Sequence, residues 1–367
     1  MHLFIIESFI SIDMLSPVIN VLKKKKILIC NINLIQDHKK NKIINFFVKK
    51  NVQYCNFLPL DKSKLFYFVL IKILISLPCF FQIRLRSLFK KFIFQYFLSS
   101  EHKIEKFLID KKVKSITYVE DAPIIYISNI YKIAKKLKIP VIKIPSGLYP
   151  GTNIYKLDNY SDKLKFCDKI ILPNKLLKTS IKNLGTKIEY FGSLRYSQEW
   201  FNFYKTKFER KSFSRKKIVL GFFKKYQSSE DNLINQLIDK LEDTKKYTIL
   251  TKEKPRDVFS IKCNKYDNDE YSSSELIDNS DIIISSRPSS ILVEAIIKEK
   301  KVILLLYANK FIKDSQYYPS KAITFVKEKK FLLKKINLKQ SMYYQKNRIK
   351  FLNKTLINWQ NYKKLKK

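Results

Sequence analysis

Hydroxyl side chains and an arginine interrupt the apolar segment at residues 281–306, DIIISSRPSSILVEAIIKEKKVILLL. The two apolar runs are typical of buried parallel strands, and the stretch from Ser289 is typical of a helix. Pro288 lies near the first helical position, where a missing N–H costs nothing. A helix N-terminus of this kind can hold a phosphate, although a simple N-cap at Ser289 or Ser290 remains an alternative. The predicted phosphate-binding residues are Ser285, Ser286, Arg287, Ser289 and Ser290.

Two further features predict a nucleotide ligand in this half of the chain. Glu294 lies one turn into the expected helix, where its carboxylate can accept hydrogen bonds from ribose hydroxyls. The sequence TKEKPR directly follows an expected strand, and its cations suit a diphosphate, although a solvated Lys-rich surface remains an alternative. The residues concerned are Lys252, Lys254 and Arg256, with Gly221 late in a neighbouring strand letting a loop approach the same ligand.

Two adjacent carboxylates, Glu120 and Asp121, follow the apolar run at residues 115–119. Adjacent acids in a partly closed site repel each other, so one of them has a raised pKa and can act as a general base. Acids also favour helix N-termini, and Pro123 is consistent with a helix that begins here. Both interpretations can hold together, and the base would deprotonate a sugar hydroxyl as that hydroxyl attacks a donor.

Other expected strands in the first half also end in polar residues or glycine. The chain has only 5 glycines, so each one indicates a backbone position that other residues cannot occupy, although a plain turn remains an alternative. Arginine after such a turn can meet an anionic group. The residues predicted on the acceptor side are Glu7, Ser8, Ser146, Gly147 and Arg195.

Composition and charge restrict the class of protein. Hydrophobic residues make up 46% of the 367-residue chain, which excludes a disordered protein. Lys and Arg number 73 against 32 Asp and Glu, a formal net charge of +41. The positive residues are spread along the chain, and the abundance of Lys, Ile, Asn, Phe and Tyr is typical of an AT-rich genome. This pattern favours anionic lipid or phosphorylated substrates over a dedicated nucleic-acid reader.

Cysteine and histidine usage indicates neither a disulfide framework nor a metal site. The 5 cysteines lie far apart without a CxxC pair, and the 3 histidines are scattered. The first residues, MHLFIIESFISID, lack the basic region of a signal peptide, so a cytoplasmic location is expected.

The apolar and aromatic segment at residues 66–98 is interrupted by Lys72, Pro78 and Arg84, which excludes a spanning helix. Two interpretations remain open. The segment is an amphipathic element on an anionic membrane surface, or it is a pair of buried helices that cover a sheet.

Strands and helices alternate along both halves of the chain, which predicts an α/β protein with two Rossmann-like, doubly wound domains facing each other across a cleft. The predicted domains are an N-terminal acceptor-side domain at 1–207, with a basic, apolar helical insertion at about 64–110, a nucleotide-donor domain at 208–340, and a C-terminal basic helix at 341–367.

With these residues together, the chain resembles a GT-B glycosyltransferase, especially the bacterial group of polysialyltransferases, Kdo transferases and related capsule enzymes. Glu120-Asp121-Ala122 resembles an acidic pair followed by Gly, with Ala in place of Gly. Lys254-Pro255 stands where the family has His-Pro, and Ser146-Gly147 stands where related transferases often have His-Gly. The serine pairs at 285–286 and 289–290 resemble the family's phosphate-binding stretch. Residues 281–303 also resemble glycerophosphotransferases of teichoic-acid synthesis and the UDP-GlcNAc 2-epimerase fold.

The resemblance implies a glycosyltransferase that moves a hexosyl, nonulosonyl or Kdo-type sugar from a nucleotide donor to a surface polysaccharide or lipid-linked glycan. It implies no cofactor besides this donor, no metal, and a cytoplasmic enzyme peripheral to the inner face of the membrane. The alternatives are a nucleotide-sugar epimerase, a non-catalytic GT-B partner subunit and a basic nucleic-acid-binding protein.

Overall fold

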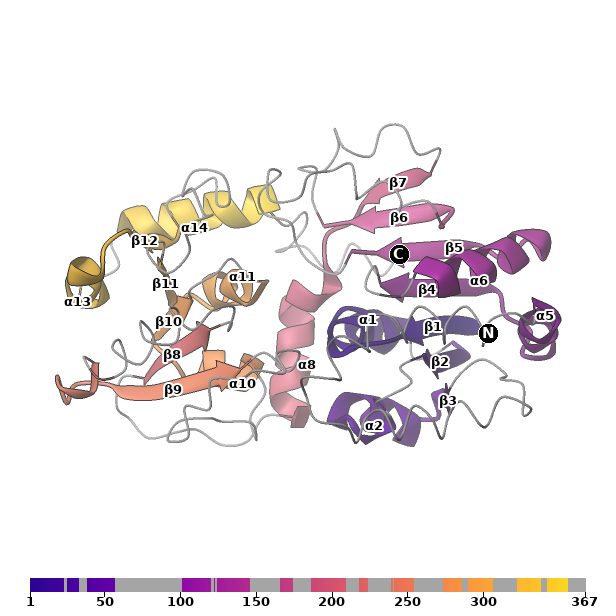
Figure 1. Cartoon of the computed structure of the whole chain (residues 1–367), viewed down its shortest axis with the longest axis horizontal. Coiled ribbons are helices and arrows are strands. Elements are labelled where there is room, and N and C mark those ends of the chain that lie inside the picture. Colours follow the sequence, from indigo (N-terminus) through magenta and orange to yellow (C-terminus); the bar gives the residue numbers. More distant parts are fainter. Residues whose placement is uncertain are drawn as a thin grey trace, which may run out of the picture. The chain divides into compact units, whose positions relative to one another are not determined.

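The computed structural model describes residues 1–22, 25–32, 38–56, 101–119, 122, 124–145, 166–173, 186–208, 218–223, 239, 241–253, 273–285, 290–305, 322–337 and 342–355. These residues divide into two compact units (Figure 1). The N-terminal unit holds the described residues up to Trp200, and the C-terminal unit holds those from Phe201 onward. The division lies inside helix α8 (Gln198–Phe208).

The N-terminal unit contains a seven-stranded parallel sheet in the order β3-β2-β1-β4-β5-β6-β7. Its strands are β1 (His2–Ile6), β2 (Ile27–Asn31), β3 (Gln53–Asn56), β4 (Ser115–Val119), β5 (Val141–Ile144), β6 (Lys169–Leu172) and β7 (Lys187–Tyr190). The chain builds outward from β1 in one direction and from β4 in the other. The β1/β4 pair is therefore a topological switch point, where ligands of open α/β sheets bind beyond the carboxyl ends of the strands.

Helices α1 (Phe9–Leu22) and α2 (Lys42–Lys49) pack against each other, and α5 (Glu101–Asp110) packs against α6 (Ile124–Lys136). The start of α2 illustrates the local rules. The Asn41 side chain caps it by accepting from the N–H of Ile43 at 2.9 Å, and α2 buries Ile43, Ile44 and Phe47 on one face.

The C-terminal unit contains a five-stranded parallel sheet in the order β12-β11-β10-β8-β9. Its strands are β8 (Ile218–Phe223), β9 (Thr248–Glu253), β10 (Ile282–Ser285), β11 (Lys301–Leu305) and β12 (Thr324–Val326). Here the order reverses between β8 and β10, so this pair is the second switch point.

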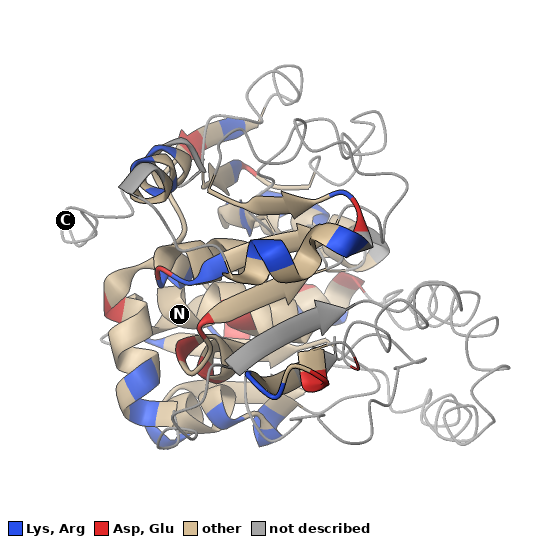
Figure 2. Ribbon diagram, turned by 90° about the vertical axis from the view of Figure 1, so that its left-hand side faces the viewer, with Lys and Arg blue, Asp and Glu red and all other residues tan. Residues whose placement is uncertain are grey.

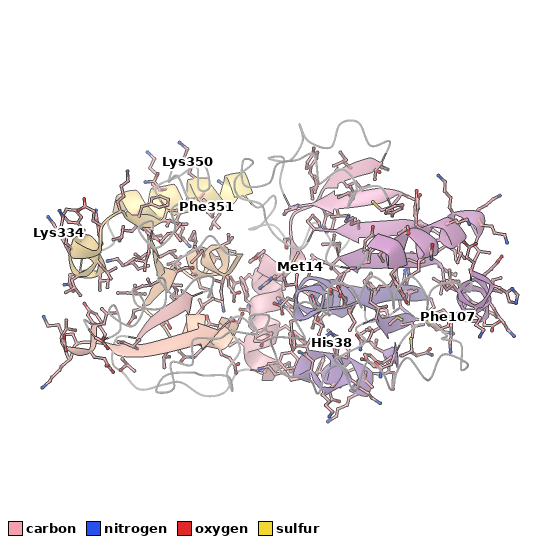
Figure 3. All side chains as sticks on the ribbon, viewed as in Figure 1. Met14, His38, Phe107, Lys334, Lys350 and Phe351 are labelled. Atoms are coloured by element: carbon pink, nitrogen blue, oxygen red, sulfur yellow. The ribbon has the colours of Figure 1, made fainter. Side chains whose placement is uncertain are left out.

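Four described helices accompany this sheet: α10 (Ser273–Asp278), α11 (Ser290–Ile297), α13 (Leu332–Asn337) and α14 (Met342–Thr355). Helix α14 belongs to this unit because its Phe351 is fully buried and its Tyr344 hydroxyl donates to the carbonyl oxygen of Lys300 at 2.9 Å. Figure 3 shows Phe351 and the exposed Lys350 on different sides of α14. The basic helix expected in this region therefore packs against α11 and the segment at its C-terminal end, residues 297–300.

The strands expected from the sequence are confirmed to within one or two residues at each end; they were expected at 3–6, 27–31, 115–119, 140–144, 169–172, 187–191, 218–223, 247–251, 281–285 and 302–306. Strands β3 and β12 and helix α2 were not predicted, and α1 begins at Phe9, whereas a helix at 14–22 was expected. The predicted apolar segment at 66–98 lies outside the described residues. No helix within the described ranges is long and apolar enough to cross a bilayer. Figure 2 shows Lys and Arg on several helices and loops of the described ribbon, in agreement with their spread along the sequence.

Candidate functional site

The switch point of the N-terminal sheet lies where two strands end level with each other. Ile5 pairs with Tyr118, so β1 ends at Ile6 and β4 at Val119, each one residue further on. The predicted bases Glu120 and Asp121 come next in the sequence and lie outside the described residues. Ala122, which follows them, is buried and donates its N–H to the Val119 carbonyl oxygen at 3.1 Å. The predicted base positions thus follow a strand that borders the switch point.

Glu7 and Ser8, predicted on the acceptor side, connect β1 to α1 at this edge. The Ser8 hydroxyl accepts from the N–H of Ile10 at 3.1 Å, so it acts as an N-cap of α1. The Glu7 N–H donates to the Ser11 hydroxyl at 3.3 Å, and the Glu7 side chain is buried. These bonds hold the turn after β1 in one conformation. A role for either residue toward an acceptor remains a prediction.

His38 also lies at this edge, and no role was expected for this histidine from the sequence. It begins a short 3₁₀ helix after β2 and is labelled in Figure 3. His38 is 1% exposed, and its ring lies edge-on to that of Phe9 with centroids 5.5 Å apart. Its Nε2 lies 3.0 Å from the Glu7 carbonyl oxygen. Because a carbonyl oxygen only accepts, Nε2 must carry the proton in this bond. The signal in the sequence was the position of His38 shortly after a strand end.

Arg195 follows β7 by a sharp turn at Gly192, whose φ of 91° favours glycine. The guanidinium lies 3.3 Å from the Asp13 carboxylate of α1 and 5.5 Å from the centre of the Tyr196 ring. Arg195 therefore ties the segment after β7 to α1. Its predicted contact with an anionic ligand remains a prediction, and Ser146 and Gly147 lie outside the described residues.

An apolar cavity of about 500 Å³ lies in the N-terminal unit on the sheet face that carries Phe4. It runs from the amino ends of the strands, at His2 and Ser115, to their carboxyl ends, at Ile144 and Pro173. Met14 and Val18 of α1 and Phe191 after β7 also line it. A cavity with this lining suits an apolar group of a ligand.

The strand and the helix predicted on either side of the serine-rich stretch are confirmed in the C-terminal unit. Strand β10 ends at Ser285, which is 2% exposed, and helix α11 begins at Ser290, one residue later than predicted. Ser285 pairs with Phe222 of β8, so it ends a strand that borders the second switch point. The predicted residues Ser286, Arg287 and Ser289 lie outside the described residues, and Ser290 is described only by its place in the helix.

Glu294 takes part in a buried network that joins α11 to α10. Its carboxylate accepts a hydrogen bond from the Ser274 hydroxyl and lies 3.1 Å from the Lys298 ammonium. Lys298 also contacts Asp278 at 2.7 Å. Burial lowers the pKa of Lys298, but the charges of Glu294 and Asp278 outweigh burial and raise it. Glu294, which was predicted to bind a ribose, thus also joins α11 to α10. Its carboxylate oxygens still have lone pairs for a further hydrogen-bond donor.

The other predicted donor-side residues lie on β8 and β9 or beyond them. Gly221 lies inside β8 between Ile284 and Thr251, and Lys252 pairs with Phe222 in β9. Lys254 and Arg256 lie outside the described residues. Among the residues that the structure describes, no group of three or more His, Cys, Asp or Glu could hold a metal ion.

No family model matches the sequence, and no curated protein matches it either. Solved structures match it over almost its whole length. A candidate UDP-N-acetylglucosamine 2-epimerase from Listeria monocytogenes has a TM-score of 0.61 at 8% identity, covering 98% of this chain and 92% of that chain. The UGT2 protein of Phytolacca americana, solved with UDP-2-fluoro-glucose and pterostilbene, has a TM-score of 0.54 at 11% identity, covering 96% and 93%.

The glycosyltransferase SnogD from Streptomyces nogalater has a TM-score of 0.53 at 9% identity, covering 99% of this chain and 98% of that chain. This chain has the GT-B fold. The predicted fold class is confirmed. At 8–11% identity the likeness extends to the fold alone, which glycosyltransferases and 2-epimerases share.

Proposed function

We propose that this GT-B protein is a glycosyltransferase that moves a sugar from a nucleotide donor to a hydroxyl of a surface glycan or its lipid-linked precursor. The observation that carries the proposal is the β10–α11 unit, a hydroxyl-ended strand at a switch point followed by a helix N-terminus. Such a unit suits the phosphates of a nucleotide. The likeness to nucleotide-sugar enzymes over nearly the whole chain supports this choice of ligand.

The proposed donor site uses the C-terminal unit. The serines at 285, 286, 289 and 290, with Arg287, bind the diphosphate or phosphate, and Lys252, Lys254 and Arg256 neutralise its charge. Glu294 accepts from the ribose. As the bond between the anomeric carbon and the phosphate oxygen breaks, the electron pair leaves with the nucleotide, and fixed cations and helix N–H groups stabilise the charge without a metal.

The proposed acceptor side uses the N-terminal unit. The acceptor hydroxyl oxygen attacks the anomeric carbon, and its proton passes to Asp121 or Glu120. The cavity of about 500 Å³, lined mainly by apolar side chains, supports an acceptor with an apolar portion, as a lipid-linked glycan has. We propose that this reaction takes place in the cytoplasm at the inner face of the membrane, and that membrane contact involves residues 66–98.

The experiment is donor turnover by the full-length protein with UDP-, CMP-, GDP- and CDP-linked sugars, followed by mass spectrometry. Loss of a general base reduces the rate by about 10²–10⁴-fold, so we expect Asp121→Asn or Glu120→Gln to lose at least about 100-fold. Glu101→Gln is the control, because Glu101 pairs with Lys132 on the exposed surface. Full turnover in both the Asp121 and Glu120 variants would show that neither residue is the base.

The second candidate is a nucleotide-sugar 2-epimerase, favoured by the TM-score of 0.61 to the Listeria protein, compared with 0.53 and 0.54 for the two transferase-related structures above. A 2-epimerase inverts the configuration at one carbon of the sugar in its nucleotide-sugar substrate, and it needs no acceptor. NMR of each donor incubated with the protein alone separates the two functions. A new stereoisomer of the intact donor supports the epimerase, whereas acceptor-dependent release of nucleotide supports the transferase.

A further inference from the structure

Two cysteines that are far apart in the sequence lie directly opposite each other in the N-terminal sheet. Cys30 of β2 and Cys55 of β3 are register partners, both are free, and their thiols are hydrogen-bonded to each other. Paired positions on adjacent parallel strands point to the same face and lie about 4.8 Å apart. This separation falls within the Cα range of about 4.4–6.8 Å found in disulfides. The register therefore already gives the two Cα atoms a separation that a disulfide can span.

The two thiols differ in exposure and acidity. Cys30 is 0% exposed, whereas Cys55 is half-buried on β3, the last strand in the described sheet order. The hydrogen bond from Cys30 and the charge of Lys111 lower the pKa of Cys55, although burial opposes them. The same hydrogen bond and complete burial raise the pKa of Cys30. An accessible, more acidic thiol beside a buried second thiol is the arrangement of an attacking and a resolving cysteine.

Cys167 provides an internal contrast. It is buried, and burial is the main cause that raises its pKa to about 11. Its thiolate fraction near neutral pH is therefore small, and its reaction with oxidants is slow. Among the three cysteines that the structure describes, Cys55 is thus the one set up to react first.

We propose that Cys55 is a thiol modification site and that Cys30 resolves the modification by closing a disulfide between β2 and β3. The Cys55 thiolate attacks a low-molecular-weight disulfide, RSSR, which forms a mixed disulfide and releases one thiolate, RS⁻. The Cys30 sulfur then attacks the Cys55 sulfur, and the thiol proton of Cys30 passes to the departing RS group, which leaves as the thiol RSH. Two protein thiols are oxidised, and one small disulfide is reduced to two thiols.

The proposed Cys30–Cys55 disulfide would form next to residues that are already held by hydrogen bonds at the carboxyl edge of the N-terminal sheet. The following register pair, Asn31 and Asn56, is joined by a side-chain hydrogen bond of 3.2 Å, and His38 follows β2 at the carboxyl edge of the sheet. The disulfide would therefore fasten β3 to β2 beside the residues that hold the turn after β1. This proposal does not depend on the enzymatic function, because it concerns thiol chemistry alone.

The test uses the full-length chain with Cys79→Ser and Cys263→Ser, so that only the three described cysteines remain. The protein is treated with oxidised glutathione under native conditions, and intact mass and peptide mapping are followed over time. We expect a Cys30–Cys55 disulfide that dithiothreitol reverses, with Cys167 unmodified. A stable glutathione adduct on Cys167, or no Cys30–Cys55 disulfide, would overturn the proposal.

Two single variants in this background assign the roles. In Cys30→Ser the glutathione adduct should persist on Cys55, because no resolving thiol remains, whereas Cys55→Ser should protect Cys30 from modification. An adduct on Cys30 at the parent rate in Cys55→Ser would show that Cys55 is not the attacking thiol. If a variant fails to fold, the protein that keeps Cys30, Cys55 and Cys167 is alkylated with iodoacetamide, and the rates at these cysteines are compared. Cys55 should react at least about tenfold faster than Cys167. Equal rates would contradict the proposal.

Discussion

Each of the two sheets has a topological switch point, but different kinds of residue follow the strands there. The β1/β4 switch point is followed by carboxylates, Glu7 after β1 and Glu120 with Asp121 after β4 in the sequence. The β8/β10 switch point is followed by hydroxyls and the N-terminus of α11. The first set can accept a proton and the second can hold an anion. The comparison teaches that the fold provides two equivalent edges, and that the proposed division of roles depends on the residues that follow the strands there.

The largest expected effect tests this division kinetically. Asp121→Asn should lower kcat with little change in donor KM, because the base acts on the acceptor proton in the transition state. Arg287→Ala should raise donor KM and lower kcat/KM by about 100-fold, because a charge-assisted bond to phosphate is lost. Steady-state kinetics measure kcat and donor KM, with whichever of the UDP-, CMP-, GDP- or CDP-linked sugars the protein turns over.

A matched control for Arg287→Ala is Arg195→Ala in the N-terminal unit, whose guanidinium pairs with Asp13. It should leave donor KM within about twofold if the donor phosphate belongs to the C-terminal unit alone. An equal rise of donor KM in both arginine variants would contradict the division of labour.

A smaller effect separates the structural role of Glu294 from its proposed ribose contact. Glu294→Ala leaves Lys298 with Asp278 alone in a buried site, so we expect a loss of about 2–3 kcal/mol in the free energy of unfolding. Urea unfolding followed by circular dichroism measures this loss. The control, Glu101→Ala, breaks an exposed pair with Lys132 and should cost less than about 0.5 kcal/mol.

The proposed ribose contact is tested separately by measuring nucleotide binding to the Glu294→Gln variant. This amide can keep the hydrogen bond to the Ser274 hydroxyl, and it removes one negative charge beside Lys298. Weaker nucleotide binding in the folded Gln variant supports a ribose contact. Unchanged nucleotide binding by Glu294→Gln would leave Glu294 with the structural role alone.

The smallest expected effect concerns α14 and alkaline pH. Burial is the main cause that raises the pKa of Tyr344 to about 12, from an ordinary value of 10.0. Between these values the unfolded chain releases this proton while the folded chain keeps it, so stability falls as pH rises from about 10 to about 12. Tyr344→Phe should reduce this slope and cost about 1 kcal/mol at pH 8, because the hydroxyl donates to the Lys300 carbonyl oxygen.

The matched comparison for Tyr344 is Tyr247→Phe in the same unit, whose hydroxyl donates to the Asn337 side chain at 2.6 Å on the exposed surface. Burial also raises the pKa of Tyr247, but without the large shift of Tyr344. Urea unfolding at pH 8, 10 and 11.5 should therefore show a smaller change of slope for Tyr247→Phe. An unchanged slope for Tyr344→Phe would contradict the assignment.

Strands rich in Ile, Leu and Val were predictable because strands buried on both faces leave a continuous apolar run, as in β1, β2, β10 and β11. Strand β3 escaped prediction because its four residues, Gln53–Asn56, are exposed or half-buried and carry no such run. The i,i+4 pair of Glu294 and Lys298 lies on one helix face and was readable in the sequence. Asp278, which completes this network from α10, was not readable because helix packing brings it there.

The sequence by itself determined the alternation of strands and helices, the hydroxyl-rich stretch before α11 and the acidic pair after β4, because these depend on periodicity and on neighbours along the chain. The tertiary structure alone decided that Cys30 meets Cys55, that His38 binds the turn at Glu7, and that Arg195 turns back to Asp13. The physical reason is that each of these contacts joins segments whose meeting depends on sheet order and register. Both follow from burying apolar surface over the whole unit, which no local pattern encodes.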